Sequence, residues 1–138
     1  MDYAAFTRML IEDLRAHGGT ASVGPMTGRT LMILTTKGAR TGQERTAVIT
    51  YTRDGGRYAI AASKGGAPTH PAWFHNLLAD PLVTVEAGGE TFKARATVAD
   101  GEERDQLWDR HSTTWPEFRE YPRKTDRVIP MIVLDRID

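Results

Sequence analysis

The stretch RTAVITYTRDGGRYAIAAS, residues 45–63, determines what kind of sheet this chain can form. Its two halves are rich in β-branched and aromatic residues, and the Asp-Gly-Gly between them is typical of a tight hairpin turn. We therefore expect antiparallel strands over residues 45–52 and 57–63. A second pair, LVTVEA and ETFKARATVA, flanks Gly88 and Gly89 in the same way. These hairpins indicate an antiparallel sheet and argue against a doubly wound parallel one.

Apolar periodicity predicts the other elements. Helices are expected over residues 2–16, 71–79 and 100–114, and two further strands over 31–36 and 128–137. On the first helix the residues expected to share one face are Tyr3, Phe6, Leu10 and Leu14.

Three local signals refine these boundaries. Pro71 suits the first position of a helix, where its missing N–H removes no intrahelical bond. Asp100 with Glu103 resembles a capping box. Pro130 cannot donate to a ladder, so it suggests an edge strand or a bulge.

The element order α-β-β-β-α-β-β-α-β predicts an α+β fold. Six or so antiparallel strands can close into a small barrel with helices covering its ends. No internal repeat, linker or low-complexity tract divides the chain, so we expect a single domain over residues 1–138.

Composition excludes several functional classes. The 138 residues include 18 basic and 18 acidic side chains, so no overall field attracts nucleic acid or an anionic membrane. The absence of cysteine excludes disulfides and thiolate metal sites, and it suits a reducing cytoplasm. No apolar run approaches the length of a membrane span, and the N-terminus lacks the layout of a secretory signal.

The turn TTKGARTGQER places Lys37, Arg40 and Arg45 among small residues and two glycines. Guanidinium groups bind phosphate in a bidentate manner, so this turn is a candidate anion clamp. A solvated hairpin with ordinary surface charge is the alternative, because charged turns are common.

The stretch SKGGAPTHPAW follows an apolar strand and precedes a helix. Two glycines, Gly65 and Gly66, directly after Ser63 and Lys64 suit a backbone that lies against a flat or anionic ligand. A long connecting loop without a ligand is the alternative.

The histidines favour neither a metal site nor hydrolysis. His70 and His75 are not spaced like a helical metal pair. Ser63, His70 and Asp80 could in principle form a catalytic triad, but the Gly-x-Ser-x-Gly elbow is missing.

The late segment TTWPEFREYPRKTDR spaces Trp115, Phe118 and Tyr121 three apart. Packing explains most aromatics at that spacing. A lid over a pocket is the functional alternative, and stacking on single-stranded nucleic acid is disfavoured by the zero net charge.

Three stretches together resemble the deazaflavin-dependent nitroreductase family of actinobacteria and related organisms, which uses coenzyme F420. They are LTTKGARTGQERT, YAIAASKGGAPTHPAWFHNLLADPLVTV and TDRVIPMIVL. The middle stretch is the most specific, because turn chemistry alone does not require Ala-Ser-Lys-Gly-Gly followed by His-Pro-x-Trp. The resemblance implies a split β-barrel like that of FMN-binding proteins, with flanking helices.

The resemblance also implies roles for individual residues. Arg40 and Arg45 would hold the cofactor phosphate, with Lys37 and Thr41 beside them. The residues that would line or wall the deazaflavin ring are Ala61, Ala62, Ser63, Lys64, Gly65, Gly66, Pro71, Ala72 and Trp73.

The late aromatics Trp115, Phe118 and Tyr121 correspond to the segment that lines the substrate pocket in relatives, which often carry tyrosines there. Only Tyr121 of the three keeps a hydroxyl, so Tyr121 and Ser63 are the candidate side-chain proton donors, and a water molecule is the alternative.

The implied activity is hydride transfer from reduced F420 to an electron-poor small molecule, namely a quinone, an enone or a nitroaromatic. Two alternatives stay open: a barrel that binds F420 or a hydrophobic ligand without turnover, and an oxidoreductase that uses FMN. We expect a cytoplasmic monomer or homodimer without a metal or nucleic-acid partner. Weak peripheral association with a membrane stays open as well.

Overall fold

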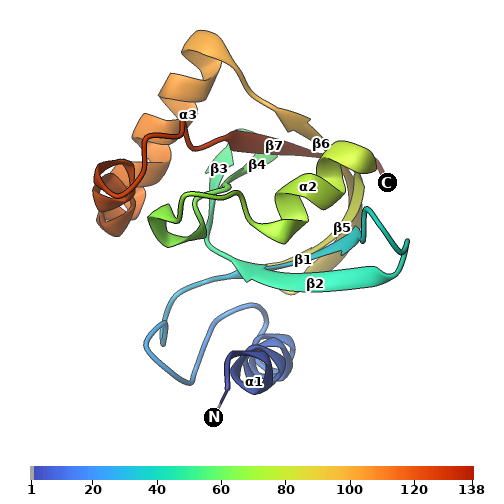
Figure 1. Ribbon diagram of the computed structural model, residues 1–138. Helices are drawn as coiled ribbons and strands as arrows, with labels where there is room; N and C mark the ends of the chain where they lie inside the picture. Colours follow the sequence, from blue (N-terminus) through green and yellow to red (C-terminus); the bar gives the residue numbers. More distant parts are fainter. Residues whose placement is uncertain (1) are drawn as a thin grey trace.

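The centre of the protein is a strongly curled antiparallel sheet, as the computed structural model of residues 2–138 shows (Figure 1). Its seven strands are hydrogen-bonded in the order β2-β1-β5-β6-β7-β4-β3. They are β1 (Met32–Lys37), β2 (Glu44–Ile49), β3 (Tyr51–Asp54), β4 (Arg57–Ala61), β5 (Leu82–Ala87), β6 (Glu90–Val98) and β7 (Met131–Arg136). The expected α+β fold and its antiparallel pairing are confirmed.

Helices flank this sheet. The α-helices are α1 (Tyr3–Ala16), α2 (Ala72–Ala79) and α3 (Gly101–Thr114), and two 3-10 helices are η1 (Lys64–Gly66) and η2 (Pro116–Arg123). None of the helices in the described part of the chain is long and apolar enough to cross a bilayer.

The sheet curls because strands β2 and β3 lie at its two opposite edges while a single residue, Thr50, separates them along the chain. The expected strand over 45–52 is therefore two strands, which explains seven strands where about six were expected. Thr50 is buried at the bend. The chain passes there from one edge of the sheet to the other, so the sheet must wrap into a half-barrel (Figure 1).

Strands β4 and β7 are buried on both faces. Their inward side chains fill the barrel, and their outward side chains pack beneath α3 and η2. The inward set is Tyr58, Ile60, Ile132 and Leu134, and the outward set is Ala59, Ala61, Met131 and Val133. This alternation follows from the two-residue period of a strand. Packing on both faces fixes the position of the end of β4, and the polar loop of residues 63–70 follows that end in the chain.

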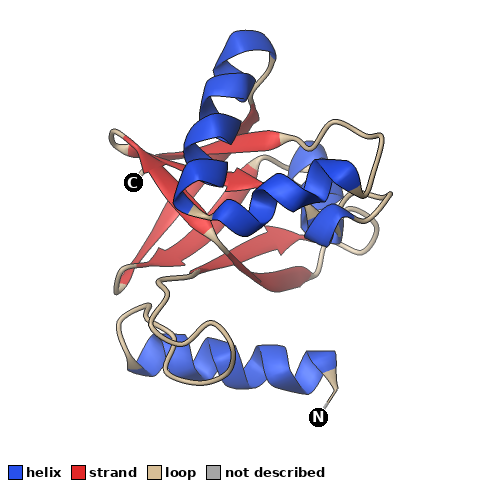
Figure 2. Ribbon diagram, turned by 90° about the vertical axis from the view of Figure 1, so that its left-hand side faces the viewer, coloured by secondary structure: helices blue, strands red, loops and turns tan. Residues whose placement is uncertain are grey.

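Helix α1 lies along one side of the sheet, apart from the other helices (Figure 2). Asp2 caps it by accepting a hydrogen bond from the backbone N–H of Ala5 at 2.7 Å. Leu10 and Leu14 are buried against the sheet as expected, but Tyr3 is 86% exposed. The expected apolar face therefore does not extend to Tyr3.

Three local predictions are wrong in detail. Pro71 is the residue before helix α2, with extended backbone (ψ 154°), and Ala72 is the first helical residue. Asp100 does begin α3, but its side chain makes no capping hydrogen bond. Pro130 lies directly before β7, which is an interior strand; no ladder bond is lost there, and the Pro130 carbonyl accepts from the Ala62 N–H at 2.9 Å.

Candidate functional site

A groove of about 960 Å³ lies where the β1–β2 turn, the end of β4, the start of α2 and η2 meet. These segments are distant in sequence, and the curl of the sheet brings them together. The predicted site residues that line it are Arg40, Thr41, Arg45, Ala61, Ser63, Lys64, Gly65, Pro71, Ala72, Trp73 and Phe118.

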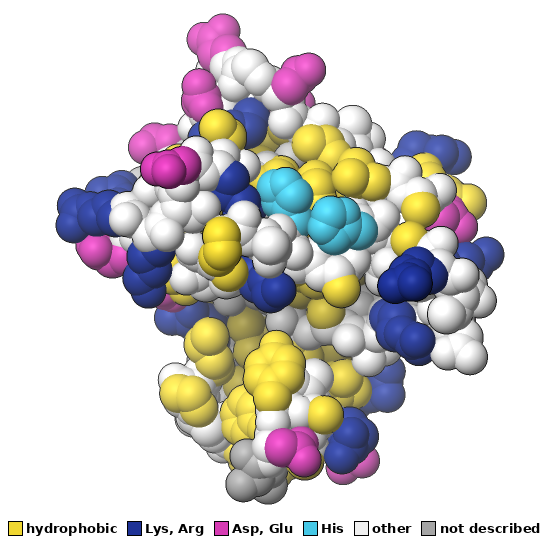
Figure 3. All heavy atoms as spheres, viewed as in Figure 1, with side chains coloured by type: hydrophobic (Ala, Val, Ile, Leu, Met, Phe, Trp, Pro, Cys, Tyr) yellow, Lys and Arg dark blue, Asp and Glu magenta, His cyan; other side chains and the backbone are white. Residues whose placement is uncertain are grey.

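One end of the groove is cationic. Arg40 and Arg45 line it, and neither forms an ion pair with any carboxylate among residues 2–138. Figure 3 shows basic side chains gathered on the side of the molecule where the β1–β2 turn lies in Figure 1. Guanidinium groups that form no ion pair within this part of the chain are available to an anionic ligand.

The β1–β2 turn, which carries Arg40 and leads to Arg45 at the start of β2, is held from beneath by Asn76 of α2. The buried Asn76 side chain accepts from the Ala39 N–H at 3.0 Å and donates to Thr36 Oγ1 at 3.1 Å. Within the turn the Gly38 N–H donates to the Gln43 carbonyl at 2.7 Å. The turn is therefore fixed relative to the start of α2, which forms another wall of the groove.

The loop after β4 exposes backbone to the groove. Ser63 has right-handed helical dihedrals, Lys64 has φ +47° and Gly65 has φ +64°. Successive residues in right-handed and then left-handed conformation point their N–H groups into one concavity, which can bind an anion or an electron-rich edge. A Cβ on Gly65 would meet nothing within 4 Å, so a ligand has room to approach.

Gly66 differs from its neighbour. It has φ +84°, and a Cβ there would lie 3.0 Å from the Tyr121 carbonyl oxygen. It does not line the groove but packs against η2. The two glycines thus have separate roles, since Gly65 leaves the groove open and Gly66 allows the loop to pack closely on η2.

The rest of the groove is largely apolar. Its walls include Ala47 and Ile49 of β2, Trp73 of α2 and Phe118 of η2. Tyr3 from the start of α1 and Met26 from the loop after it also line the groove. Figure 3 shows hydrophobic side chains gathered over α1 on the same face.

Several predicted site residues lie outside the groove lining. Lys37 pairs with Asp80 at 3.8 Å, and Ala62 is fully buried in the barrel core. Trp115 donates from its indole Nε1 to the Tyr51 carbonyl at 3.1 Å. Tyr121 packs its ring on Phe118, with centroids 5.0 Å apart. Burial raises the pKa of Tyr121 above its usual value.

The hypothetical triad is not assembled, because His70 Nδ1 bonds to Arg127 at 3.0 Å and Asp80 pairs with Lys37. His75 does line the groove. Within residues 2–138 no cluster of His, Asp and Glu side chains could hold a metal ion.

His111 is the most strongly perturbed titratable group. It is fully buried beneath η2, where its ring meets Phe118 edge-on at 4.4 Å. Its Nδ1 lies 3.3 Å from Thr52 Oγ1, and its Nε2 has no hydrogen-bond partner. Burial lowers the pKa of His111 to about 4, opposed weakly by Glu117.

Sequence reasoning missed part of the site. Asn76 carried a signal, because it is a polar residue within the apolar helix AWFHNLLA. Tyr3 and Met26 carried none, since only the tertiary position of α1 brings them to the groove.

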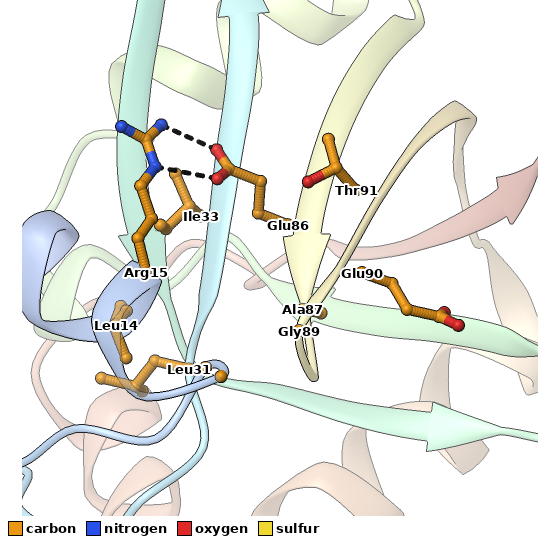
Figure 4. A pocket seen from close by; sticks show the side chains of 11 residues that line it. Leu14, Arg15, Leu31, Ile33, Glu86, Ala87, Gly89, Glu90 and Thr91 are labelled. Atoms are coloured by element: carbon orange, nitrogen blue, oxygen red, sulfur yellow. Dashed lines mark hydrogen bonds and ion pairs between the residues drawn. The ribbon is translucent and has the colours of Figure 1, made fainter.

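A second, smaller hollow of about 150 Å³ lies between α1 and the β5–β6 hairpin. Its floor is apolar, with Leu14, Leu31 and Ile33 (Figure 4). Arg15 and Glu86 form a bidentate ion pair at its edge, with both N···O distances 2.9 Å. This pair fastens α1 to β5, so we interpret the hollow as part of the α1 interface.

Comparison with known proteins gives consistent matches. A family model described as F420H(2)-dependent quinone reductase matches residues 6–136. An F420H(2)-dependent quinone reductase of Mycobacterium tuberculosis is 40% identical over 108 residues, which are 76% of this chain and 72% of the relative. A putative F420H(2)-dependent quinone reductase of Mycobacterium bovis gives the same values.

Solved structures agree with these matches. An F420-H2 dependent reductase (FDR-A) superimposes with a TM-score of 0.71 and 37% identity, covering 76% of this chain and 93% of that one. A structure described as a domain-swapped dimer superimposes with a TM-score of 0.74 and 33% identity, covering 97% and 100%. A putative pyridoxamine 5'-phosphate oxidase from Listeria innocua, 12% identical with a TM-score of 0.56, shares the fold alone.

Proposed function

The chain belongs to the F420H(2)-dependent quinone reductase family, whose members are oxidoreductases that use coenzyme F420, and we propose that its groove binds this cofactor and reduces a quinone. The observation that carries the proposal is the division of one groove into a cationic end and an apolar remainder. A planar ring with a phosphate-bearing anionic tail requires both.

The groove fits F420 at three places. Arg40 and Arg45 form no ion pair with the residues that the structure describes, and they would bind the phosphate. Ser63, Lys64 and Gly65 expose a concave backbone that would meet the polar edge of the ring. Pro71, Ala72 and Trp73 would form the wall beside it.

When bound, reduced F420 supplies the hydride, and the protein supplies position and electrostatics. The groove walls would hold the quinone face to face with the ring, and such alignment can lower the barrier by several kcal/mol. Apolar side chains such as Trp73 and Phe118 exclude water from the faces that react. A dedicated side-chain base is unnecessary.

Reduction of a quinone to a hydroquinone consumes one hydride and one proton. We propose that water delivers this proton, with the Ser63 hydroxyl oriented to donate a hydrogen bond to the acceptor oxygen. Ser63 lines the groove, whereas Tyr121 packs beneath Phe118 outside the lining, which supports Ser63 over Tyr121.

The apolar remainder of the groove favours flat, apolar acceptors. Phe118, Trp73 and Ile49 offer carbon surfaces and no ionisable group. We therefore expect quinones to be reduced faster than polar nitroimidazoles, with apolar enones as a second class of acceptor.

The test follows the absorbance of reduced F420 in the presence of this protein and menadione, cyclohexenone or a nitroimidazole. Menadione-dependent oxidation is expected. F420 binding without turnover for any acceptor would indicate a binding module, and preferential retention of FMN would indicate a flavin enzyme.

The solved relative described as a domain-swapped dimer supports a homodimer as the first assembly to test, by light scattering of the purified chain. A cytoplasmic location stays a prediction, and no observation on residues 2–138 supports contact with a membrane surface.

A further inference from the structure

Arg127, from the segment between η2 and β7, reaches across to the loop between β4 and α2. Its Nε donates to the Ala67 carbonyl at 2.9 Å, and its Nη2 donates to the Ser63 carbonyl at 2.7 Å. Its Nη1 contacts both the Ala62 carbonyl and His70 Nδ1 at 3.0 Å. One planar guanidinium therefore joins four points of a single loop.

The charged guanidinium of Arg127 binds neutral partners. Arg127 forms no ion pair within the described chain, and burial lowers its pKa. A half-buried cation normally has a carboxylate partner. Here its donors bind three backbone carbonyl groups and the ring of His70 instead, so its contribution is to fix the backbone conformation of the loop.

The backbone conformation of this loop requires a stabilising contact from outside the loop. Lys64 has φ +47°, a backbone conformation that residues other than glycine adopt only at an energetic cost. Only two backbone hydrogen bonds close the turn, from the Gly66 N–H to Ser63 and from the Ala67 N–H to Lys64, at 2.9 and 3.1 Å. Without Arg127, other loop conformations that close the groove or turn the concavity away become accessible.

We infer that Arg127 is a positioning residue, which holds the loop of residues 63–70 in the conformation that receives the cofactor ring. The inference rests on the proposed function for its effect on binding, but not for its effect on the loop. Arg127 does not line the groove, so it acts through Ser63, Lys64 and Gly65.

The experiment compares Arg127→Ala and Arg127→Lys with Arg104→Ala. Arg104 is a matched control, because its half-buried guanidinium also bonds a backbone carbonyl, that of Ile129 at 2.7 and 3.1 Å, away from the groove. Hydrogen exchange at the Gly66 and Ala67 amides measures how often the turn of the loop opens. Fluorescence titration with oxidised F420 measures binding, and thermal melting measures overall stability.

Both Arg127 variants should speed exchange at Gly66 and Ala67 and weaken F420 binding by roughly 10–100-fold, because affinity falls with the fraction of competent loop. Millimolar guanidinium should restore part of the affinity of Arg127→Ala. Arg104→Ala should lower the melting temperature and leave both readouts unchanged. Arg127→Lys keeps the charge and covers the case in which the alanine variant does not fold.

The inference is overturned if exchange at Gly66 and Ala67 is unchanged, or if F420 affinity stays within about twofold of Arg104→Ala. Failure of the unaltered protein to bind F420 would overturn the proposed function instead. The exchange rates would then still decide whether Arg127 holds the loop.

Discussion

At the scale of single residues, the clearest prediction concerns Arg40 and Arg45. Charge-assisted hydrogen bonds to phosphate contribute about 1.5–3 kcal/mol each, whereas exposed unpaired charges add little to folding. Arg40→Ala with Arg45→Ala should therefore weaken F420 binding at least about 100-fold with little change in melting temperature. The control pair Arg8→Ala and Arg95→Ala removes equal charge at exposed positions outside the groove. Equal affinities for the two double variants would refute the anion clamp.

Substitution of Tyr121 tests which group supplies the proton to the quinone. Its ring packs on Phe118, and burial raises the pKa of its hydroxyl. Tyr121→Phe should therefore lower menadione turnover by less than about threefold, with unchanged F420 affinity. A loss of about 10²–10⁴-fold, the range of general acids, would instead identify Tyr121 as the donor.

His111, which packs on Phe118 of the groove wall, makes the stability of the fold depend on pH. Its pKa is lowered from 6.5 to about 4, so the unfolded chain binds more protons than the folded one between these values. Stability is then full above about pH 6.5 and falls by up to about 3 kcal/mol as pH decreases to 4. Urea titrations at several pH values should show this loss, and His111→Leu should flatten it. An equally steep acid loss in His111→Leu would assign the effect to other groups.

At the scale of elements, Asn76 joins helix α2 to the β1–β2 turn. Asn76→Ala leaves the Ala39 N–H and the buried Thr36 hydroxyl without their partner, which should cost about 1–3 kcal/mol and weaken F420 binding. Asn76→Asp keeps the acceptor for Ala39 and should lose less affinity. Titration and melting of both variants check this. Identical affinities in both variants and the parent would show that the turn holds itself.

The elements themselves were largely predictable from sequence. The Gly-rich turns and alternating apolar residues identified both hairpins, and α1 begins within one residue of its expected start. Thr50 could not be identified as a break, because the bend arises from closure of the whole sheet and not from a local turn residue. Pro130 misled for a related reason, since its place directly before β7 becomes harmless only once the strand boundary is known.

The candidate site was predictable where the chain carries it locally. Arg40, Ser63 and Gly65 follow from turn chemistry and resemblance, and all three line one groove. Trp115 lies outside it because its indole N–H bonds to the Tyr51 carbonyl, a contact between distant segments that spacing cannot reveal. Arg127 was hidden for the same reason, since the loop that it joins lies 57 to 65 residues away.

At the scale of the whole molecule, the groove is lined in part by helix α1, which packs on the outside of the barrel. The Arg15–Glu86 pair joins residues 71 apart and fastens α1 to β5, and Tyr3 at the start of α1 reaches the groove. Tyr3 and Met26 both line the groove, and neither belongs to the cationic segment of Arg40 and Arg45. We therefore expect the position of α1 to affect the apolar part of the groove, where we propose that the acceptor binds, more than the cationic part.

Tyr3→Ala should accordingly raise the KM for menadione by roughly 3–10-fold and leave F420 affinity unchanged, because Tyr3 lines the groove although it is 86% exposed, and an aromatic contact contributes about 0.5–1.5 kcal/mol. Tyr3→Phe keeps the ring and should behave like the parent protein, which separates ring contact from any role of the hydroxyl. Arg15→Ala loosens α1 at a distance and should change the KM in the same direction as Tyr3→Ala. Steady-state kinetics with F420 titrations test all three variants. A fall in F420 affinity with an unchanged KM for menadione would place Tyr3 on the cofactor side of the groove.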